Sequence, residues 1–411
     1  MLTPEWFTPD IGSDLWWKTQ QKCGVPRIEQ CSHQQCRVTF LWRQPAPTPD
    51  SQEVKAVWIN ITGITDHHQP TPPISLVHYP NTDVWYLSLI LPSDWRGSYC
   101  LIPDPQGDIG LLEQDMFQRR EWWREKFRHA EHDKLNSLRS WSAGRGMPVS
   151  PLHLPDAPPQ LEWQAWERGE NSPVNVKQLI WKSTRLGNTR RVSWYSTAEH
   201  ESTLHQRLAL LLDGQFWATT LPIAGPLQRL TDEGRLPPAV YVMPEIIDRE
   251  HRGREYPCNS EFWQAVNEEL LPLIANQLNW QHDPAKTIVA GQSFGGLASV
   301  YACLNWPEYY GKALSLSGSF WWPNRGQASG FLPQQLAQQA PSIASRKIIL
   351  EAGRRETLIC EANREMEKWL TYYQIPHELH YVEGGHDALW WRGSLLAGLQ
   401  ALWQDEYNDK N

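Results

Sequence analysis

The sequence predicts two domains, an all-β sandwich of immunoglobulin-like type followed by an α/β domain. Three observations predict this arrangement. The chain has 411 residues, more than one ordinary hydrophobic core serves. Short apolar runs separated by Pro, Gly and Asp fill residues 37–102, whereas strand-like and helix-like segments alternate from Val176 onward. We therefore expect a sandwich over residues 1–146, a proline-rich linker over 147–160 and an α/β domain over 161–411.

The first domain contains four runs whose β-branched and aromatic residues predict strands. They are Arg37–Trp42, Lys55–Ile61, Asp83–Leu91 and Gly97–Ile102. Residues 117–138 are instead rich in helix formers, and this segment is expected to end near Asn136.

The second domain contains eight predicted strands with helices between some of them. The strands are Val176–Lys182, Arg190–Ser196, Arg207–Leu212, Ala239–Met243, Thr287–Ala290, Ala313–Ser317, Lys347–Glu351 and Glu378–Val382. Ser260–Leu278 is a predicted helix. Such alternation favours a mostly parallel sheet covered by helices on both faces.

One predicted strand leads directly into a G-x-S-x-G motif. The strand Thr287–Ala290 precedes Gly291-Gln292-Ser293-Phe294-Gly295, and a small-residue helix pattern follows. A tight strand-to-helix turn lifts a serine hydroxyl above the sheet edge, and glycines keep side chains out of the crowded turn. The motif predicts an α/β-hydrolase with Ser293 as the nucleophile.

The base of such an enzyme follows the nucleophile and the acid in the chain, on a loop after a late strand. His386 fits this position because it lies in Glu383-Gly384-Gly385-His386-Asp387, directly after the strand that ends at Val382. The two glycines allow the loop to bring an imidazole to the serine. No other of the 14 histidines combines both features.

The acid is less sharply defined. Glu356 lies in the loop after the strand Lys347–Glu351, where a carboxylate can orient the His386 ring. Glu351 at the strand end is an alternative, as is a Ser–His pair without a firm acid. Asp387 adjoins the histidine and is poorly placed to reach its neighbour's ring. The alternative to a catalytic role is that Glu356 only forms an ion pair with Arg354 or Arg355.

Backbone amides are expected to form the oxyanion hole. The Phe294 amide follows the nucleophile, and a second donor should come from the loop after an early strand. The amides of Gly214 and Gln215 fit that loop, and an ordinary strand-ending turn is the alternative. Trp217 would then stand near the site mouth as a stacking surface.

Three arginine groups lie in or near the expected mouth loops. They are Arg185, Arg190 and Arg191; Arg249, Arg252 and Arg254; and Arg354 and Arg355. A single arginine is most simply explained as a solvated surface charge, but the three groups together suggest an anionic substrate. We select Arg190, Arg252 and Arg254, with Trp217, as substrate-binding candidates.

Composition excludes several other classes. The formal net charge of −8 argues against a general nucleic-acid binder, and no apolar run approaches the ~18 residues of a membrane span. The first residues lack the basic and apolar segments of a secretory signal, so we expect a cytoplasmic protein. Cys23, Cys31 and Cys36 with His33 could form a zinc site, but ordinary reduced thiols fit better. The sequence defines no oligomeric state.

The chain resembles the ferric enterobactin esterase (enterochelin esterase) family over nearly its whole length. In the first domain the similar segments are Ile61-Thr62-Gly63-Ile64-Thr65-Asp66-His67-His68 and Trp95-Arg96-Gly97-Ser98-Tyr99-Cys100. In the second they are Leu212-Asp213-Gly214, Pro257-Cys258-Asn259 with Phe262-Trp263, Ala290 to Gly296, Ser317-Gly318-Ser319-Phe320-Trp321-Trp322-Pro323, Leu350-Glu351-Ala352-Gly353 and Gly384-Gly385-His386-Asp387-Ala388-Leu389.

The resemblance implies a cytoplasmic hydrolase that opens the trilactone of iron-loaded enterobactin, or of a related catecholate siderophore, without a cofactor, because iron arrives inside the substrate. More distant relatives, such as feruloyl esterases, have their acid at the position of Glu356, although Arg354-Arg355-Glu356-Thr357 lacks the proline expected after it. Two alternative hypotheses are a carbohydrate or feruloyl-type esterase and an inactive siderophore-binding protein. A missing secretory signal disfavours the first, and the intact serine, histidine and acid loop disfavour the second.

Overall fold

The computed structural model describes residues 4–49, 52–107, 116–144, 146–170, 174–198, 206–342 and 346–408. The chain divides into two compact units. The first comprises Met1–Asn171 and Glu383–Trp390, and the second comprises Ser172–Val382 and Trp391–Asn411. The extreme ends of the predicted domains, residues 1–3 and 409–411, lie outside the described residues.

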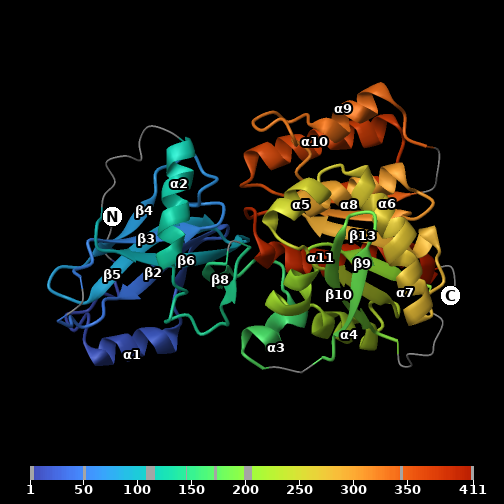
Figure 1. The fold of residues 1–411 in the computed structure, drawn as a ribbon. Coiled ribbons are helices and arrows are strands. Elements are labelled where there is room, and N and C mark those ends of the chain that lie inside the picture. The colour runs from blue at the N-terminus through green and yellow to red at the C-terminus, as the bar shows by residue number, and fades with distance from the viewer. Residues whose placement is uncertain are drawn as a thin grey trace. The chain divides into compact units, whose positions relative to one another are not determined.

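The first unit is built on an antiparallel sheet (Figure 1). Its elements are α1 (Asp14–Cys23), β1 (Arg27–Ser32), β2 (Gln35–Arg43), β3 (Ala56–Ile61), β4 (Ile74–His78), β5 (Val84–Pro92), β6 (Arg96–Asp104), α2 (Met116–Lys126), η1 (Phe127–His129), β7 (Trp141–Ser142), β8 (Pro148–His153), η2 (Leu161–Trp163) and α3 (Gln164–Glu167). The hydrogen-bonded order is β1-β2-β5-β4-β3-β6-β8-β7.

Strand β4 joins the two halves of this sheet. Its first residues pair with β3, and its last two pair with β5. Buried side chains from both halves, such as Phe40 and Leu87 on one and Ile59 and Leu101 on the other, form a common core. All four predicted strands of this domain are confirmed as β2, β3, β5 and β6. The sequence did not reveal β1, β4, β7, β8 or α1.

The predicted linker over residues 147–160 differs from the structure. Residues Pro148–His153 form β8, which pairs with β6 between Arg96↔His153 and Tyr99↔Ser150. The boundary between the units falls instead at Asn171 and Ser172. Proline suggested a linker, but proline is compatible with a strand where its missing N–H is not needed by the ladder.

The second unit contains a mixed sheet of eight strands in the order β16-β15-β14-β13-β11-β12-β10-β9. The strands are β9 (Lys177–Ser183), β10 (Asn188–Ser196), β11 (Leu208–Leu211), β12 (Val240–Pro244), β13 (Thr287–Gln292), β14 (Lys312–Leu316), β15 (Lys347–Gly353) and β16 (His377–Val382). Strands β11 to β16 are parallel to one another. Strand β10 is antiparallel to both β12 and β9, so β10 and β9 form an antiparallel edge. All eight predicted strands are confirmed.

Helices surround this sheet in Figure 1. They are η3 (Phe216–Thr220), α4 (Ala224–Asp232), α5 (Arg249–Glu255), α6 (Ser260–Ala265), η4 (Val266–Leu270), α7 (Leu271–Leu278), η5 (Pro284–Lys286), α8 (Phe294–Asn305), α9 (Phe331–Gln338), α10 (Thr357–Tyr372) and α11 (Ala388–Asn408). Elements α6, η4 and α7 together fill the predicted helix Ser260–Leu278. The central strands are mostly apolar, as expected of strands that are buried on both faces, and Val242 and Val289 illustrate this.

Candidate active site

Ser293 occupies a strained turn between β13 and α8. Its backbone has φ 58° and ψ −119°, a conformation that non-glycine residues rarely adopt. The Ser293 N–H donates to the Leu316 carbonyl oxygen on β14 at 2.9 Å, and its own carbonyl accepts from the Leu297 N–H at 3.1 Å. The turn is therefore fixed on both sides, and the side chain remains partly exposed.

Small residues make this turn possible. A Cβ on Gly291 would lie 2.6 Å from the Gly295 carbonyl carbon, and a Cβ on Gly296 would lie 2.6 Å from the Ser315 Oγ. A larger residue at either position would force strand and helix apart. Phe294 begins α8, where the first amides of a helix have no acceptor within it. The predicted strand–turn–helix geometry is confirmed.

The loop after β11 is a second strained segment at the same edge of the sheet. Asp213 has φ 58°, and a Cβ on Gly214 would lie 2.1 Å from the Met243 carbonyl oxygen of β12. Only glycine fits there. Gly214 and Gln215 begin a helical segment, so their amides lie at a helix N-terminus. The Gln215 Oε1 accepts from the Ile246 N–H at 3.1 Å, which ties that side chain to the segment after β12.

A polar network ties this loop to the serine turn. The Asp213 carboxylate accepts from Arg252 Nε at 2.6 Å, from Arg252 Nη2 at 2.8 Å and from Gln292 Nε2 at 3.0 Å. Arg252 Nη2 also donates to the Gln292 carbonyl oxygen at 3.2 Å, next to Ser293. Burial lowers the pKa of Arg252, but the Asp213 charge and hydrogen bonds outweigh it and the net shift is upward. The sequence did not reveal this network.

Two of the predicted substrate contacts are corrected by burial. The Arg190 side chain is 2% exposed and forms a two-pronged ion pair with Glu255, at 2.9 and 2.7 Å. Trp217 is 1% exposed and donates from Nε1 to the Gln292 Oε1 at 3.3 Å. Arg190 is thus a core ion pair and Trp217 a core support beneath the serine turn, and neither lines a mouth. Strand and helix packing around their positions covers them, which local sequence does not show.

The other two arginine candidates differ from each other. The Arg252 side chain is 21% exposed, with its guanidinium directed at Asp213 as described above. Arg254 is 60% exposed and reaches Glu250 one turn earlier on α5, at 3.5 Å. Of the three arginines, Arg254 alone has the exposure that we expected of a ligand contact.

The two candidate acids lie in different environments. Glu356, in the loop after β15, is buried, and its Oε2 accepts from Ser317 Oγ at 2.7 Å and from the Gly353 N–H at 2.9 Å. Ser317 follows β14 with φ 49° and accepts in turn from Trp391 Nε1 at 3.0 Å. These two donors therefore hold the Glu356 carboxylate in one orientation. Burial instead raises the pKa of Glu351 to about 7, so that side chain is partly neutral near neutral pH.

Ser293 and Glu356 therefore lie at the carboxyl ends of the parallel strands of one sheet. β13, β14 and β15 are consecutive neighbours, and the Ser293 turn and Ser317 are both attached at the end of β14. His386 belongs to the segment Glu383–Trp390, which groups with the first unit. Within that unit its ring centroid lies 5.9 Å from that of His68.

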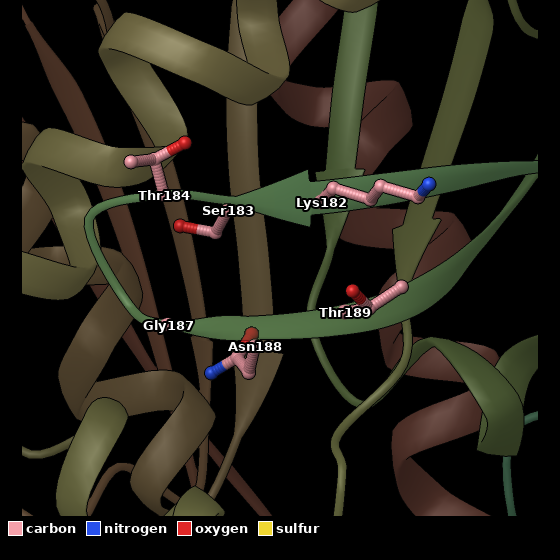
Figure 2. Close-up of a pocket in the computed structure, with 6 residues that line it drawn as sticks. All are labelled: Lys182, Ser183, Thr184, Gly187, Asn188 and Thr189. Atoms are coloured by element: carbon pink, nitrogen blue, oxygen red, sulfur yellow. The ribbon is translucent and has the colours of Figure 1, made fainter.

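Other candidate features carry less chemistry. Figure 2 shows a shallow polar hollow along the β9–β10 hairpin, lined by Lys182, Ser183, Thr184, Gly187, Asn188 and Thr189, none of them a predicted site residue.

Among the described residues, no three His, Cys, Asp or Glu side chains gather as a metal-binding group, and Cys23, Cys31 and Cys36 are free thiols. Within the same ranges, none of the helices is both long and apolar enough to cross a bilayer.

The strand order of the second unit and the strained serine between β13 and α8 define the α/β-hydrolase class of serine esterases. Two family models match the chain, "Enterochelin esterase, N-terminal" over residues 37–163 and Esterase over residues 183–402. The chain belongs to the enterochelin (iron(III) enterobactin) esterase family.

Individual relatives agree along the whole chain. The iron(III) enterobactin esterase of Escherichia coli K12 is 43% identical over 403 residues, covering 98% of this chain and 99% of that protein. The ferric enterobactin esterase structure from Salmonella typhimurium superposes with a TM-score of 0.88 at 42% identity, covering 96% and 100%. The enterobactin esterase of Shigella flexneri, solved in the presence of enterobactin, gives 0.87 at 41% identity, covering 96% and 99%.

Proposed function

We propose that this protein hydrolyses the ester bonds of the iron-loaded enterobactin trilactone, or of a closely related catecholate siderophore. The products are dihydroxybenzoyl-serine units, from which iron is released in the cytoplasm. The observation that carries the proposal is the strained Ser293 turn in a chain that matches an iron(III) enterobactin esterase over 98% of its length. Iron enters as part of the substrate, and the mechanism uses no resident metal or cofactor.

The proposed chemistry is acyl transfer through Ser293. Its Oγ attacks the ester carbonyl carbon while His386 takes the hydroxyl proton. The C–O bond to the leaving seryl oxygen then breaks, and His386 returns the proton to that oxygen. A water molecule attacks the acyl-serine in the same way, its proton passing through His386 to the Ser293 Oγ. The carboxylic acid leaves and the free enzyme is restored.

Glu356 and two backbone amides complete the proposal. A buried carboxylate held by Ser317 and the Gly353 amide can orient the His386 ring and stabilise its cation without accepting the proton. The amides of Phe294 and of Gly214 or Gln215, both at helix N-termini, are the proposed oxyanion donors. The Asp213–Arg252–Gln292 network supports this assignment because it fixes one donor loop against the other.

Product analysis tests the proposal directly. The full-length protein is incubated with ferric enterobactin, and the shortened catecholates are resolved by chromatography. Ser293→Ala is the matched control, and a neutral aryl ester reports on general esterase activity. We expect Ser293-dependent cleavage of both substrates. Ser293-dependent cleavage of the aryl ester alone would refute the siderophore as substrate. Failure of a fluorophosphonate to label Ser293 would refute the enzyme and leave a binding protein.

A further inference from the structure

The segment Glu383–Trp390, called here the histidine loop, is held at both ends by strand β6. The Arg96 N–H donates to the Glu383 carbonyl oxygen at 3.3 Å. The Trp390 Nε1 donates to the carbonyl oxygens of Arg96 at 3.0 Å and Glu383 at 3.1 Å. The Arg96 guanidinium also lies 4.9 Å from the Trp390 ring centroid. One residue of the first domain therefore closes the two ends of the loop against each other.

The middle of the histidine loop is fixed by a buried carboxylate. Asp387, next to His386, accepts from the Ser98 Oγ at 2.5 Å and from the Ser98 N–H at 2.5 Å through its two oxygens. Its Oδ1 also accepts from the Leu389 N–H at 2.9 Å. Ser98 and Asp387 are each only 4% exposed. Because a buried polar group that loses its hydrogen-bond partners is costly, these three hydrogen bonds oppose displacement of the loop.

The residue on the other side of His386 is fixed by close packing. A Cβ on Gly385 would lie 2.6 Å from both the Cα and the N of Gly63, so the two backbones touch. Gly63 itself is held in place, because its N–H donates to the buried Asp66 Oδ2 at 2.8 Å. Both chain neighbours of His386 are thus anchored to the first domain, one by Ser98 and one by Gly63.

We propose that Ser98 is a positioning residue for the hydrolysis, acting through Asp387 on His386. This inference rests on the proposed function, in which His386 is the general base. A base must lie within hydrogen-bond reach of the proton it takes, and a misplacement of about 1 Å can cost about a hundredfold in rate. The first domain thereby acquires a role in catalysis in addition to any contact with substrate.

The competing explanation is that the Ser98–Asp387 contact only stabilises the fold. Ser150 on β8 provides a matched control, because it is also a buried serine, on the strand paired with β6. Its Oγ accepts from the Asp133 N–H at 2.9 Å, so Ser150→Ala removes a comparable hydrogen bond without touching the histidine loop.

The test compares Ser98→Ala with Ser150→Ala in the full-length protein. We measure kcat and KM, the rate of Ser293 labelling by a fluorophosphonate, and the thermal midpoint. We expect Ser98→Ala to lower kcat and the labelling rate together, by between about tenfold and a hundredfold, with KM within about twofold of wild type. Ser150→Ala should lower the midpoint similarly while keeping kcat and labelling. Asp387→Asn, which keeps the side-chain volume, should repeat the Ser98→Ala result.

Equal behaviour of Ser98→Ala and Ser150→Ala would overturn the inference. If Ser98→Ala does not fold, wild-type labelling and kcat in Asp387→Asn would overturn it instead. His386→Ala separates this failure from that of the proposed function. Labelling that survives His386→Ala would show that another group activates Ser293, whereas labelling lost in His386→Ala but retained in Ser98→Ala would reject only the positioning role.

Discussion

The serine turn and the histidine loop reach fixed geometries in different ways. The serine turn depends strongly on a local contact, because a Cβ on Gly291 would lie 2.6 Å from Gly295, four residues later in one strand–turn–helix unit. The neighbouring strand β14 then holds the turn through the Leu316 carbonyl oxygen. The histidine loop is determined at long range, because Gly385 packs on Gly63 and Asp387 binds Ser98, both from the N-terminal domain. A motif can therefore reveal the proposed nucleophile, whereas the proposed base depends on a domain that the motif does not include.

The largest expected effect comes from removing the reactive side chain of each region. Ser293→Ala and His386→Ala should each lower kcat by on the order of a millionfold, because the two residues act as a unit. Their double variant should lose little more. Ferric enterobactin turnover followed by chromatography measures this, with thermal unfolding as the control for folding. Additive losses in the double variant would contradict a joint role.

A somewhat smaller effect distinguishes the two acids. Glu356→Gln should lower kcat about ten-thousandfold, because an amide neither stabilises the imidazolium nor holds the correct tautomer. Glu351→Gln, the matched control on the same strand end, should keep kcat within about threefold of wild type. Steady-state kinetics on a neutral aryl ester check both. A damaged Glu351→Gln beside a normal Glu356→Gln would reverse the assignment.

One methyl group added at each close backbone contact should distort the serine turn and the histidine loop separately. Gly291→Ala and Gly385→Ala should both lower kcat by about a hundredfold, since each Cβ would lie 2.6 Å from backbone atoms. Gly225→Ala on α4 is the control, as its Cβ would have one ordinary contact at 3.8 Å. Limited proteolysis should find the N-terminal domain unaffected by Gly291→Ala. Normal kcat in Gly385→Ala would show that the histidine loop tolerates displacement from Gly63.

Arg252 and Arg254 should separate a geometric role from a binding role. Arg252→Lys loses the two-pronged contact with Asp213 and should lower kcat roughly tenfold at similar KM. Arg254→Ala should raise KM a few-fold for the iron-loaded trianion but not for a neutral aryl ester. Initial rates on both substrates measure the split. If Arg252→Lys raised KM for the trianion alone, Arg252 would be a substrate contact after all.

The smallest effect is a pH dependence of stability arising from Glu351. Burial raises the pKa of Glu351 to about 7, above its ordinary value of 4.5, so the folded protein retains a proton that the unfolded chain releases. The Glu351 contribution is therefore full below about pH 4.5 and is lost as pH rises to about 7, by up to about 3 kcal/mol. Urea unfolding of wild type and Glu351→Gln from pH 4.5 to 8 should show this loss in wild type only. A constant difference between the two proteins would contradict it.

The sequence alone determined the features that depend on neighbours along the chain. Apolar periodicity located the eight strands of the second domain, and the Gly291–Gly295 motif predicted the strained turn because its contacts are local. The loop positions of Glu356 and His386 were likewise readable from where strands end. The family resemblance added a predicted substrate to these predictions about the fold and the site.

The tertiary structure decided which polar side chains already bind a partner inside the protein and which are buried by packing. Arg190 and Trp217 became core residues, and Pro148–His153 became a strand rather than a linker. The Ser98–Asp387 contact likewise joins residues far apart in sequence. The physical reason is that a charge or an indole near a loop has the same local signature whether it binds a ligand or a buried partner, and only the folded chain brings that partner to it.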